Sequence, residues 1–321
     1  MKESRFKIYM CVLLMLAFCG GVFARGVGPA PLPAAEVGAK AEPAPSDGAD
    51  DAPDTPRWLE LPRMTMPDNC ITVTHFTEIG QLQVRNYTIC YDTVARISYW
   101  VAYPLHKLYL GGGKRSDSWK YDPLVGREYQ VNVSRSFGGG YDRGHQIPSA
   151  DRSVTREANG QTFYATNVTP QRSAFNQRVW NRLEAKLRKA LGEDTIYIVS
   201  GAVLGGEASV RPLSYSSDGA QRNTPSCPAG GDQEKGAPYS SVGGAAVPDF
   251  YFKVVLYSRG QELRTIGFWY DHSADYPAVP SPAQACIVAE IEKLTGFDFF
   301  ANLPDEVQRC IENEYFPEDW F

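Results

Sequence analysis

The segment 140–151, which reads GYDRGHQIPSAD, carries side chains whose chemistry suits a phosphate group. Arg143 and His145 are separated only by Gly144, and Asp142 precedes them. Residues two apart on a β-strand point to the same face. A guanidinium can bind phosphate oxygens, an imidazole can take a proton from water, and a glycine lets a substrate approach the main chain. The segment therefore predicts a site for phosphodiester cleavage.

A second set of polar side chains follows in the clearest predicted helix, about 174–191. Its apolar residues recur every four positions, as Phe175, Val179, Leu183 and Leu187. Asn176, Trp180 and Glu184 share that spacing, so they lie on one side of the helix, within about 80° of one another. Asn176 and Glu184 are also about 12 Å apart along the axis, too far for both to bind one ion directly. We expect the Asn176 amide oxygen to bind a hard cation and Glu184 to hold a water on it.

Each of these residues also has a purely structural interpretation. Asn176 could only cap the helix, Glu184 could only pair with Arg188 four residues later, and Trp180 could only fill the core. The remaining histidines have no such neighbours and are interpreted as packed or surface residues: His75, His106 and His272. The combination of strand segment and helix is what favours a site.

The ordered motifs closely resemble the DNA/RNA non-specific endonuclease family, the endonuclease G-like ββα-metal nucleases. The motifs are Asp142-Arg-Gly-His145, Asn167-x-x-Pro-Gln171 and Asn176-x-x-x-Trp180-x-x-x-Glu184. The likeness includes Tyr91-Asp92-x-x-x-Arg96 and extends over about 70–303. Three motifs in family order are much more specific than one alone.

The resemblance implies a role for each matching residue. His145 corresponds to the general base that activates water, and Arg143 to an arginine near the scissile phosphate. Asn176 corresponds to the sole direct protein ligand of one Mg²⁺ (or Mn²⁺), and Glu184 to a carboxylate that orients the metal's waters. Asn167 and Gln171 correspond to amides that brace the site. Asp142 and Trp180 are also expected to support the catalytic and metal-binding residues. Arg96 is a candidate phosphate contact.

The implied reaction uses a water molecule as nucleophile and not the ribose 2′-hydroxyl. DNA and RNA are therefore both expected substrates, with products that carry 5′-phosphates. Attack requires unprotonated His145, so an ordinary imidazole predicts that activity falls below a pH of about 6.5.

Strand-like segments surround the predicted helix. They lie near 71–74, 82–84, 97–103, 195–199, 250–257 and 263–270, and a second helix is expected near 284–295. The pattern lacks regular alternation of strand and helix. It predicts an α+β fold with a mostly antiparallel central sheet, flanked by helices and containing a ββα-metal motif.

The N-terminal region has the features of an exported protein. Residues 1–24 have a basic start, an apolar run and a small-residue cleavage site, as a signal peptide does. Lipid attachment at Cys19 is the less favoured alternative, because bulky Phe18 precedes it. Residues 25–56 are rich in Pro, Ala and Asp and predict a disordered linker. Residues 57–321 would form the nuclease domain, with a surface insertion at about 205–246, and the mature chain shows no transmembrane segment.

The charge distribution favours a polyanion bound at one place. The whole chain has a net charge of −5, whereas residues 141–190 contain nine Lys or Arg and four Asp or Glu, a local +5. On the helix, Arg178 and Arg182 are candidate substrate contacts, or else belong to its solvated face. The expected partner is nucleic acid, and the sequence leaves open whether the chain forms a homodimer.

An exported chain favours disulfides. The proposed pairs are Cys70–Cys90 and Cys286–Cys310, which leaves Cys227 without a partner.

Two other functions compete with the nuclease interpretation. One is a catalytically inactive relative that binds nucleic acid, and the other is a hydrolase of different phosphodiesters. The presence of every motif residue disfavours an inactive relative. The basic flank of the helix favours a polymeric substrate, and so disfavours a hydrolase of other phosphodiesters.

Overall fold

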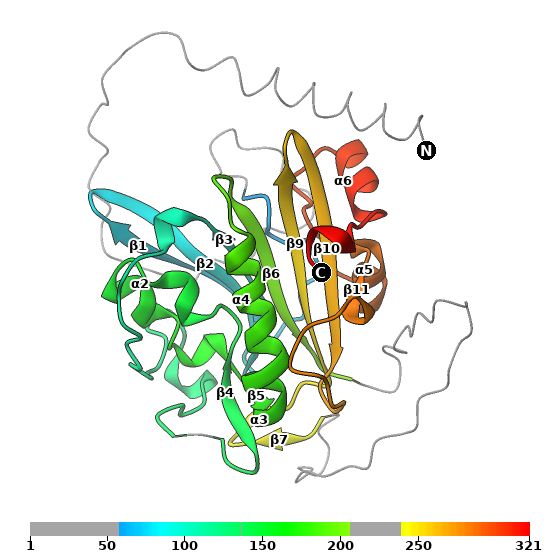
Figure 1. The fold of residues 1–321 in the computed structure, drawn as a ribbon. Coiled ribbons are helices and arrows are strands. Elements are labelled where there is room, and N and C mark those ends of the chain that lie inside the picture. The colour runs from blue at the N-terminus through cyan, green and yellow to red at the C-terminus, as the bar shows by residue number, and fades with distance from the viewer. Residues whose placement is uncertain (1–57, 136, 206–238) are drawn as a thin grey trace.

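Seven strands form one antiparallel sheet at the centre of the molecule. The computed structural model describes residues 58–135, 137–205 and 239–321 (Figure 1). Along the sheet the strands are β1 (Cys70–Ile79), β2 (Leu82–Asp92), β3 (Ile97–Leu105), β6 (Ile196–Val203), β9 (Phe250–Arg259), β10 (Glu262–Asp271) and β11 (Ala285–Cys286). Every neighbouring pair in it is antiparallel, which confirms the predicted α+β class.

Both faces of the sheet are covered, which explains the nearly continuous apolar runs of its central strands. In β9, Tyr251 and Val255 pack into the core on one face, whereas Phe252 and Val254 pack into the core on the other. Successive strand side chains point to opposite faces, so one strand contributes to two cores.

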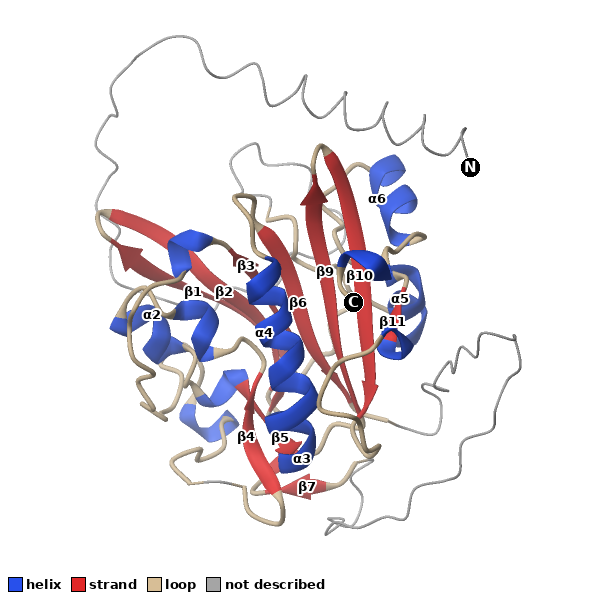
Figure 2. Cartoon of the chain, in the orientation of Figure 1, coloured by secondary structure: helices blue, strands red, loops and turns tan. Residues whose placement is uncertain are grey.

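The two faces carry different layers. One face carries a two-stranded sheet, β4 (Tyr141–His145) with β5 (Val168–Arg172), and the helices α2 (Arg156–Gln161), α3 (Ser173–Phe175) and α4 (Asn181–Ala190). Figure 2 shows α4 crossing over β6, with β4 and β5 beside its N-terminal end. The opposite core contains residues of α5 (Val288–Thr295) and α6 (Asp305–Glu312). Short 3₁₀ helices lie at Lys107–Tyr109, Arg127–Tyr129, Ser149–Arg152, Ala165–Asn167, Pro282–Gln284 and Pro317–Asp319.

The predicted helix at 174–191 is present with an irregular start. Asn176–Trp180 forms a π-helical turn between α3 and α4. The second predicted helix begins at Val288, because Pro282–Gln284 forms a 3₁₀ turn and Ala285–Cys286 pairs with β10. Helix α6 was not predicted.

Part of the predicted insertion is ordered. Ser241–Val242 (β7) and Ala245–Ala246 (β8) form a small hairpin, and the Ala246 amide donates to the Ala95 carbonyl. The predicted signal peptide, the linker and the 206–238 part of the insertion with Cys227 lie outside the described residues. Among the residues that the structure does describe, none of the helices has the length and hydrophobicity needed to cross a bilayer.

The predicted disulfides are not formed. Cys70, Cys90, Cys286 and Cys310 are all free thiols. In the β1–β2 register Cys70 lies opposite Asp92, and Cys90 lies opposite Thr72, so the two cysteines are diagonal neighbours. Diagonal neighbours lie farther apart than directly opposed residues, and the two side chains are in contact as thiols without a bond between them. The sequence pattern identified the hairpin but not this register.

Candidate active site

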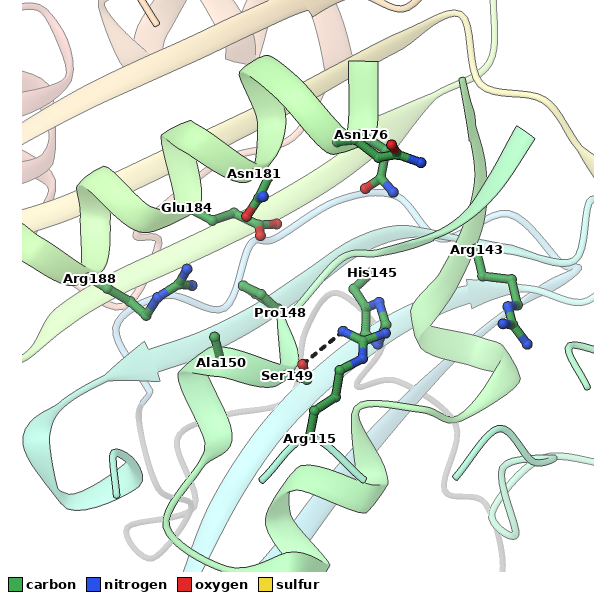
Figure 3. Close-up of a pocket in the computed structure, with 11 residues that line it drawn as sticks. Arg115, Arg143, His145, Pro148, Ser149, Ala150, Asn176, Asn181, Glu184 and Arg188 are labelled. Carbon is green, nitrogen blue, oxygen red and sulfur yellow. Dashed lines mark hydrogen bonds between the residues drawn. The ribbon is translucent and has the colours of Figure 1, made fainter. Parts of the chain in front are cut away.

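Strand β4 and the following helix meet at a pocket of about 260 Å³. Its polar lining comprises Arg115, Arg143, His145, Ser149, Asn176, Gln177, Asn181, Glu184 and Arg188 (Figure 3). The structure therefore brings together four of the residues singled out in the sequence: Arg143, His145, Asn176 and Glu184.

His145 ends strand β4, and its ring packs against two aromatic side chains that also contact each other. The ring centroids of Trp119 and Phe163 lie 5.1 and 4.9 Å from the imidazole centroid. Burial lowers the pKa of His145 to about 3, helped by the charges of Arg115 and Arg143. Its Nε2 is buried without a hydrogen-bond partner. The neutral ring therefore offers Nε2 as a proton acceptor.

The lowered pKa corrects the expectation of an activity loss below a pH of about 6.5. That value assumed an exposed imidazole. His145 instead stays unprotonated well below it, so an acid limb in that region must come from another group.

Asp142 fixes the orientation of the Asn176 amide. Its Oδ2 accepts a hydrogen bond of 3.0 Å from Asn176 Nδ2 and one of 2.8 Å from Gln177 Nε2, and its Oδ1 accepts from Ser173 Oγ. Burial raises the pKa of Asp142, but these hydrogen bonds outweigh burial and the net shift is downward. With its nitrogen held by Asp142, Asn176 has its amide oxygen left to bind a cation.

Asn176 begins the π-helical turn, which changes the geometry assumed for the helix. The estimate of about 80° between Asn176 and Glu184 used a regular α-helix. A π turn accommodates an extra residue and often occurs at functional sites. Asn176 and Glu184 nevertheless line the same pocket.

Glu184 lies at the inner end of the pocket beside a buried lysine. The Nζ of Lys253 is 3.9 Å from Glu184 Oε1, 3.0 Å from Ser200 Oγ and 4.4 Å from the Trp180 ring centroid. Burial raises the pKa of Glu184, and the positive charge of Lys253 opposes that shift. Trp180 thus supports the site through Lys253, whose role the sequence did not indicate.

Three arginines surround the pocket. Arg143 donates to the Val133 carbonyl at 2.9 Å and lies 3.9 Å from the Trp119 ring centroid. Arg115 donates to Ser149 Oγ at 3.2 Å, the dashed line in Figure 3. Arg188 donates to Asp151 Oδ1 at 2.6 Å. This cationic rim suits an anionic substrate.

Sequence reasoning missed Arg115, Gln177 and Asn181 as pocket residues. It considered Arg188 only as a partner for Glu184 or as part of the basic helix flank. Arg115 belongs to no recognised motif and reaches the pocket from the loop after the Gly111–Gly113 cluster. Its only sequence signal is a positive charge beside those glycines.

Asn167 and Gln171 brace the strand pair. Asn167 Oδ1 accepts from the Ile147 amide at 2.9 Å, and its Nδ2 donates to the Ile147 carbonyl at 3.0 Å. Gln171 pairs with Asp142, and its buried side chain packs against Gly144. Asn167 therefore fixes the chain just after His145.

The remaining candidates lie outside this pocket. Arg96 donates to the Glu128 carbonyl, and Arg178 and Arg182 are exposed on the helix. None of the three is among the residues that line the pocket.

The pocket fits a hard cation held mainly by water. In the described part of the chain, no group of three or more His, Cys, Asp and Glu side chains could hold a metal. The pocket instead offers the Asn176 amide oxygen as a direct ligand and the Glu184 carboxylate as an acceptor for water. Few protein ligands and several waters are typical of Mg²⁺ sites.

Fold and site define a ββα-metal nuclease, and the chain belongs to the DNA/RNA non-specific endonuclease family, whose model matches residues 68–306. It is 31% identical to the "Nuclease" of Nostoc sp. over 76% of this chain and 81% of that protein. It is 25% identical to human "Endonuclease G, mitochondrial" over 70% of this chain and 71% of that protein.

A solved structure of an EndoG/EndoGI complex shares the fold. Its TM-score is 0.54 at 19% sequence identity, over 72% of this chain and 88% of that chain. The chain is therefore an endonuclease that hydrolyses phosphodiester bonds of nucleic acid, in a family that depends on a divalent metal.

Proposed function

We propose that this chain is an exported, Mg²⁺-dependent endonuclease that cuts DNA and RNA without regard to the sugar and leaves 5′-phosphates. One observation supports this most directly. A neutral histidine with a free Nε2 and an asparagine with an oriented amide line the same pocket.

Each pocket residue has a separate role in the proposed reaction. His145 accepts the proton of the attacking water at Nε2. The rim arginines attract and orient the phosphate chain, Arg143 nearest the histidine in sequence. Asn176 holds the ion, and Glu184 orients water on it. When bound, Mg²⁺ would stabilise negative charge on the phosphate and the leaving oxygen.

The activity is tested with supercoiled plasmid and with ribosomal RNA. Both should be cleaved in Mg²⁺, and EDTA or His145→Ala should abolish cleavage. Binding of nucleic acid without cleavage in Mg²⁺ would contradict the proposal.

The products are tested by end labelling. Fragments with 5′-phosphates accept label from polynucleotide kinase only after phosphatase treatment. Efficient labelling without phosphatase would show 5′-hydroxyl ends and exclude a water nucleophile that releases the 3′-oxygen.

The metal roles are tested by comparing two variants. Asn176→Ala should lose more activity than Glu184→Ala, because it removes a direct ligand and not a group acting through water. Equal or reversed losses would contradict the assignment.

Export and the domain boundaries are tested on the mature protein. A signal peptide over residues 1–24, followed by a linker over 25–56, predicts a mature chain that begins at Arg25 in the periplasm or the medium. A chain that begins at a lipid-modified Cys19 would support the lipoprotein alternative instead.

A further inference from the structure

Four sulfur atoms meet in the core on the sheet face opposite α4. Cys90 Sγ in β2 lies 3.9 Å from Met64 Sδ and 3.7 Å from Met66 Sδ. The Cys90 thiol also interacts directly with the Cys70 side chain at the start of β1. One thiol and two thioethers thus all contact the Cys90 thiol.

The spacing of these atoms matches metal coordination. Three or four sulfurs that bind one ion through bonds of about 2.3 Å are separated by about 3.8–4.0 Å. The two measured separations from Cys90 Sγ, 3.7 and 3.9 Å, are close to that range.

The type of ligand selects the ion. Thiolate and thioether sulfurs together favour Cu(I), whereas Mg²⁺ takes oxygen ligands and structural Zn²⁺ takes Cys and His. We propose that Met64, Met66, Cys70 and Cys90 form a binding site for one Cu(I) ion.

The surroundings hold the ligands in place and leave a route for the ion. Trp100 Nε1 donates to Met64 Sδ at 3.4 Å, which fixes the thioether. Cys90 is fully buried, whereas Met64, Met66 and Cys70 are partly exposed. The ion can therefore enter past the methionines.

Binding requires no change of oxidation state. Without an ion the Cys90 side chain is a thiol. Cu(I) breaks the S–H bond, forms an S–Cu bond, and releases the proton to solvent.

Such an ion would connect the segment 58–69 to the hairpin β1–β2. Other contacts of that segment include the buried ion pair Glu60–Arg85 and the main-chain bonds between Arg63 and Asp298. The ion would therefore raise thermal stability without contacting the nuclease pocket.

The test is a titration of the reduced full chain with Cu(I) under nitrogen, in competition with the chelator bicinchoninate. One equivalent should bind per chain and raise the melting temperature. The size-matched double variant Met64→Leu/Met66→Leu should lose at least tenfold in affinity, with its copper-free melting temperature confirming that it folds.

Cysteine variants complete the test. Cys90→Ser should abolish binding, whereas Cys227→Ser/Cys286→Ser/Cys310→Ser should bind as the wild type does. The proposal is overturned if the wild type takes no copper from the chelator, or if the methionine variant binds equally well. It is also overturned if mass spectrometry finds a Cys70–Cys90 disulfide and the protein, once reduced, binds no copper.

Discussion

At the scale of single residues, the site depends on side chains that orient other side chains. Asp142 accepts hydrogen bonds from both Asn176 and Gln177 and so determines which atom of the Asn176 amide is free. The ring of His145 packs against Trp119 and Phe163, and this burial keeps it neutral. The sequence motif names the reacting groups, but their protonation state and direction come from these neighbours.

Removal of Asp142 should weaken metal binding. In Asp142→Ala the Asn176 amide loses the acceptor for its nitrogen, so the oxygen is no longer held toward the ion. The loss of such an outer partner typically costs about 10–100-fold in metal affinity. The Mg²⁺ concentration for half-maximal plasmid cleavage measures the effect.

Gln177→Ala is the matched control, because it removes a second donor to Asp142 and leaves the Asn176–Asp142 bond intact. Its half-maximal Mg²⁺ concentration should stay near that of the wild type. An equal increase in both variants would exclude a specific role for the Asn176–Asp142 bond.

At the scale of elements, close contacts between strands and helices hold the pocket together. Strand β4 pairs with β5, with Gly144 opposite Thr169, and the Gln171 side chain occupies the space where a Cβ on Gly144 would lie. Helix α4 is joined to β9 through the buried pair Glu184 and Lys253. The sequence did not indicate that the Gln171 side chain packs on Gly144 or that Lys253 lies beside Glu184.

Gly144→Ala should destabilise the protein and lower its activity. An added Cβ would lie 2.2 Å from Gln171 Cδ, so β4 or the Gln171 side chain must shift, at a cost of about 1–3 kcal/mol. Urea unfolding measures the loss. The double variant Gly144→Ala/Gln171→Ala should lose less stability than the sum of the single variants, and strict additivity would show that the predicted clash is absent.

Lys253→Met should shift the acid limb of the pH–activity profile to higher pH. In the proposed reaction the Glu184 carboxylate orients water on the metal. Burial raises the pKa of this carboxylate, and the charge of Lys253 lowers it. Without the lysine charge, the pKa of Glu184 rises further and the carboxylate is lost at a higher pH. The profile of kcat/KM against pH tests this, and a loss of activity with no shift of the limb would indicate a purely structural role.

At the scale of the whole molecule, buried histidines make the fold sensitive to acid. Burial lowers the pKa of His272 to about 4. Its ring accepts from the Arg172 amide at 2.7 Å and contacts the Pro248 carbonyl, so it connects β5 to the chain before β9. Protonation would cost this junction a hydrogen-bond acceptor.

The free energy of unfolding should therefore fall between pH 7 and pH 5. An unfolded histidine takes up a proton below a pH of about 6.5, whereas His272 in the folded state does so only near 4, so acid favours the unfolded state. The contribution is about 2 kcal/mol at pH 5. Urea unfolding at both pH values should show a smaller difference for His272→Gln, and an unchanged difference would contradict this assignment.

The sequence by itself determined the family, the class of fold and the candidates His145 and Asn176. Reactive side chains at fixed spacing, apolar alternation in strands and the four-residue repeat of the helix are local properties, and local properties can be read from the chain. Residues 141–190 therefore revealed the motif, its charge and the helix that follows it.

Only the tertiary structure decided which other residues reach the pocket and how each group is charged. Arg115 lies in a loop distant in sequence from the motif, and Lys253 lies in β9. The pKa of His145 is determined by the residues that bury it and by nearby charges. The same applies to the cysteines, since a shift of two positions in strand register decides whether two thiols can join. These properties depend on contacts between residues far apart in the sequence, and spacing along the chain does not encode such contacts.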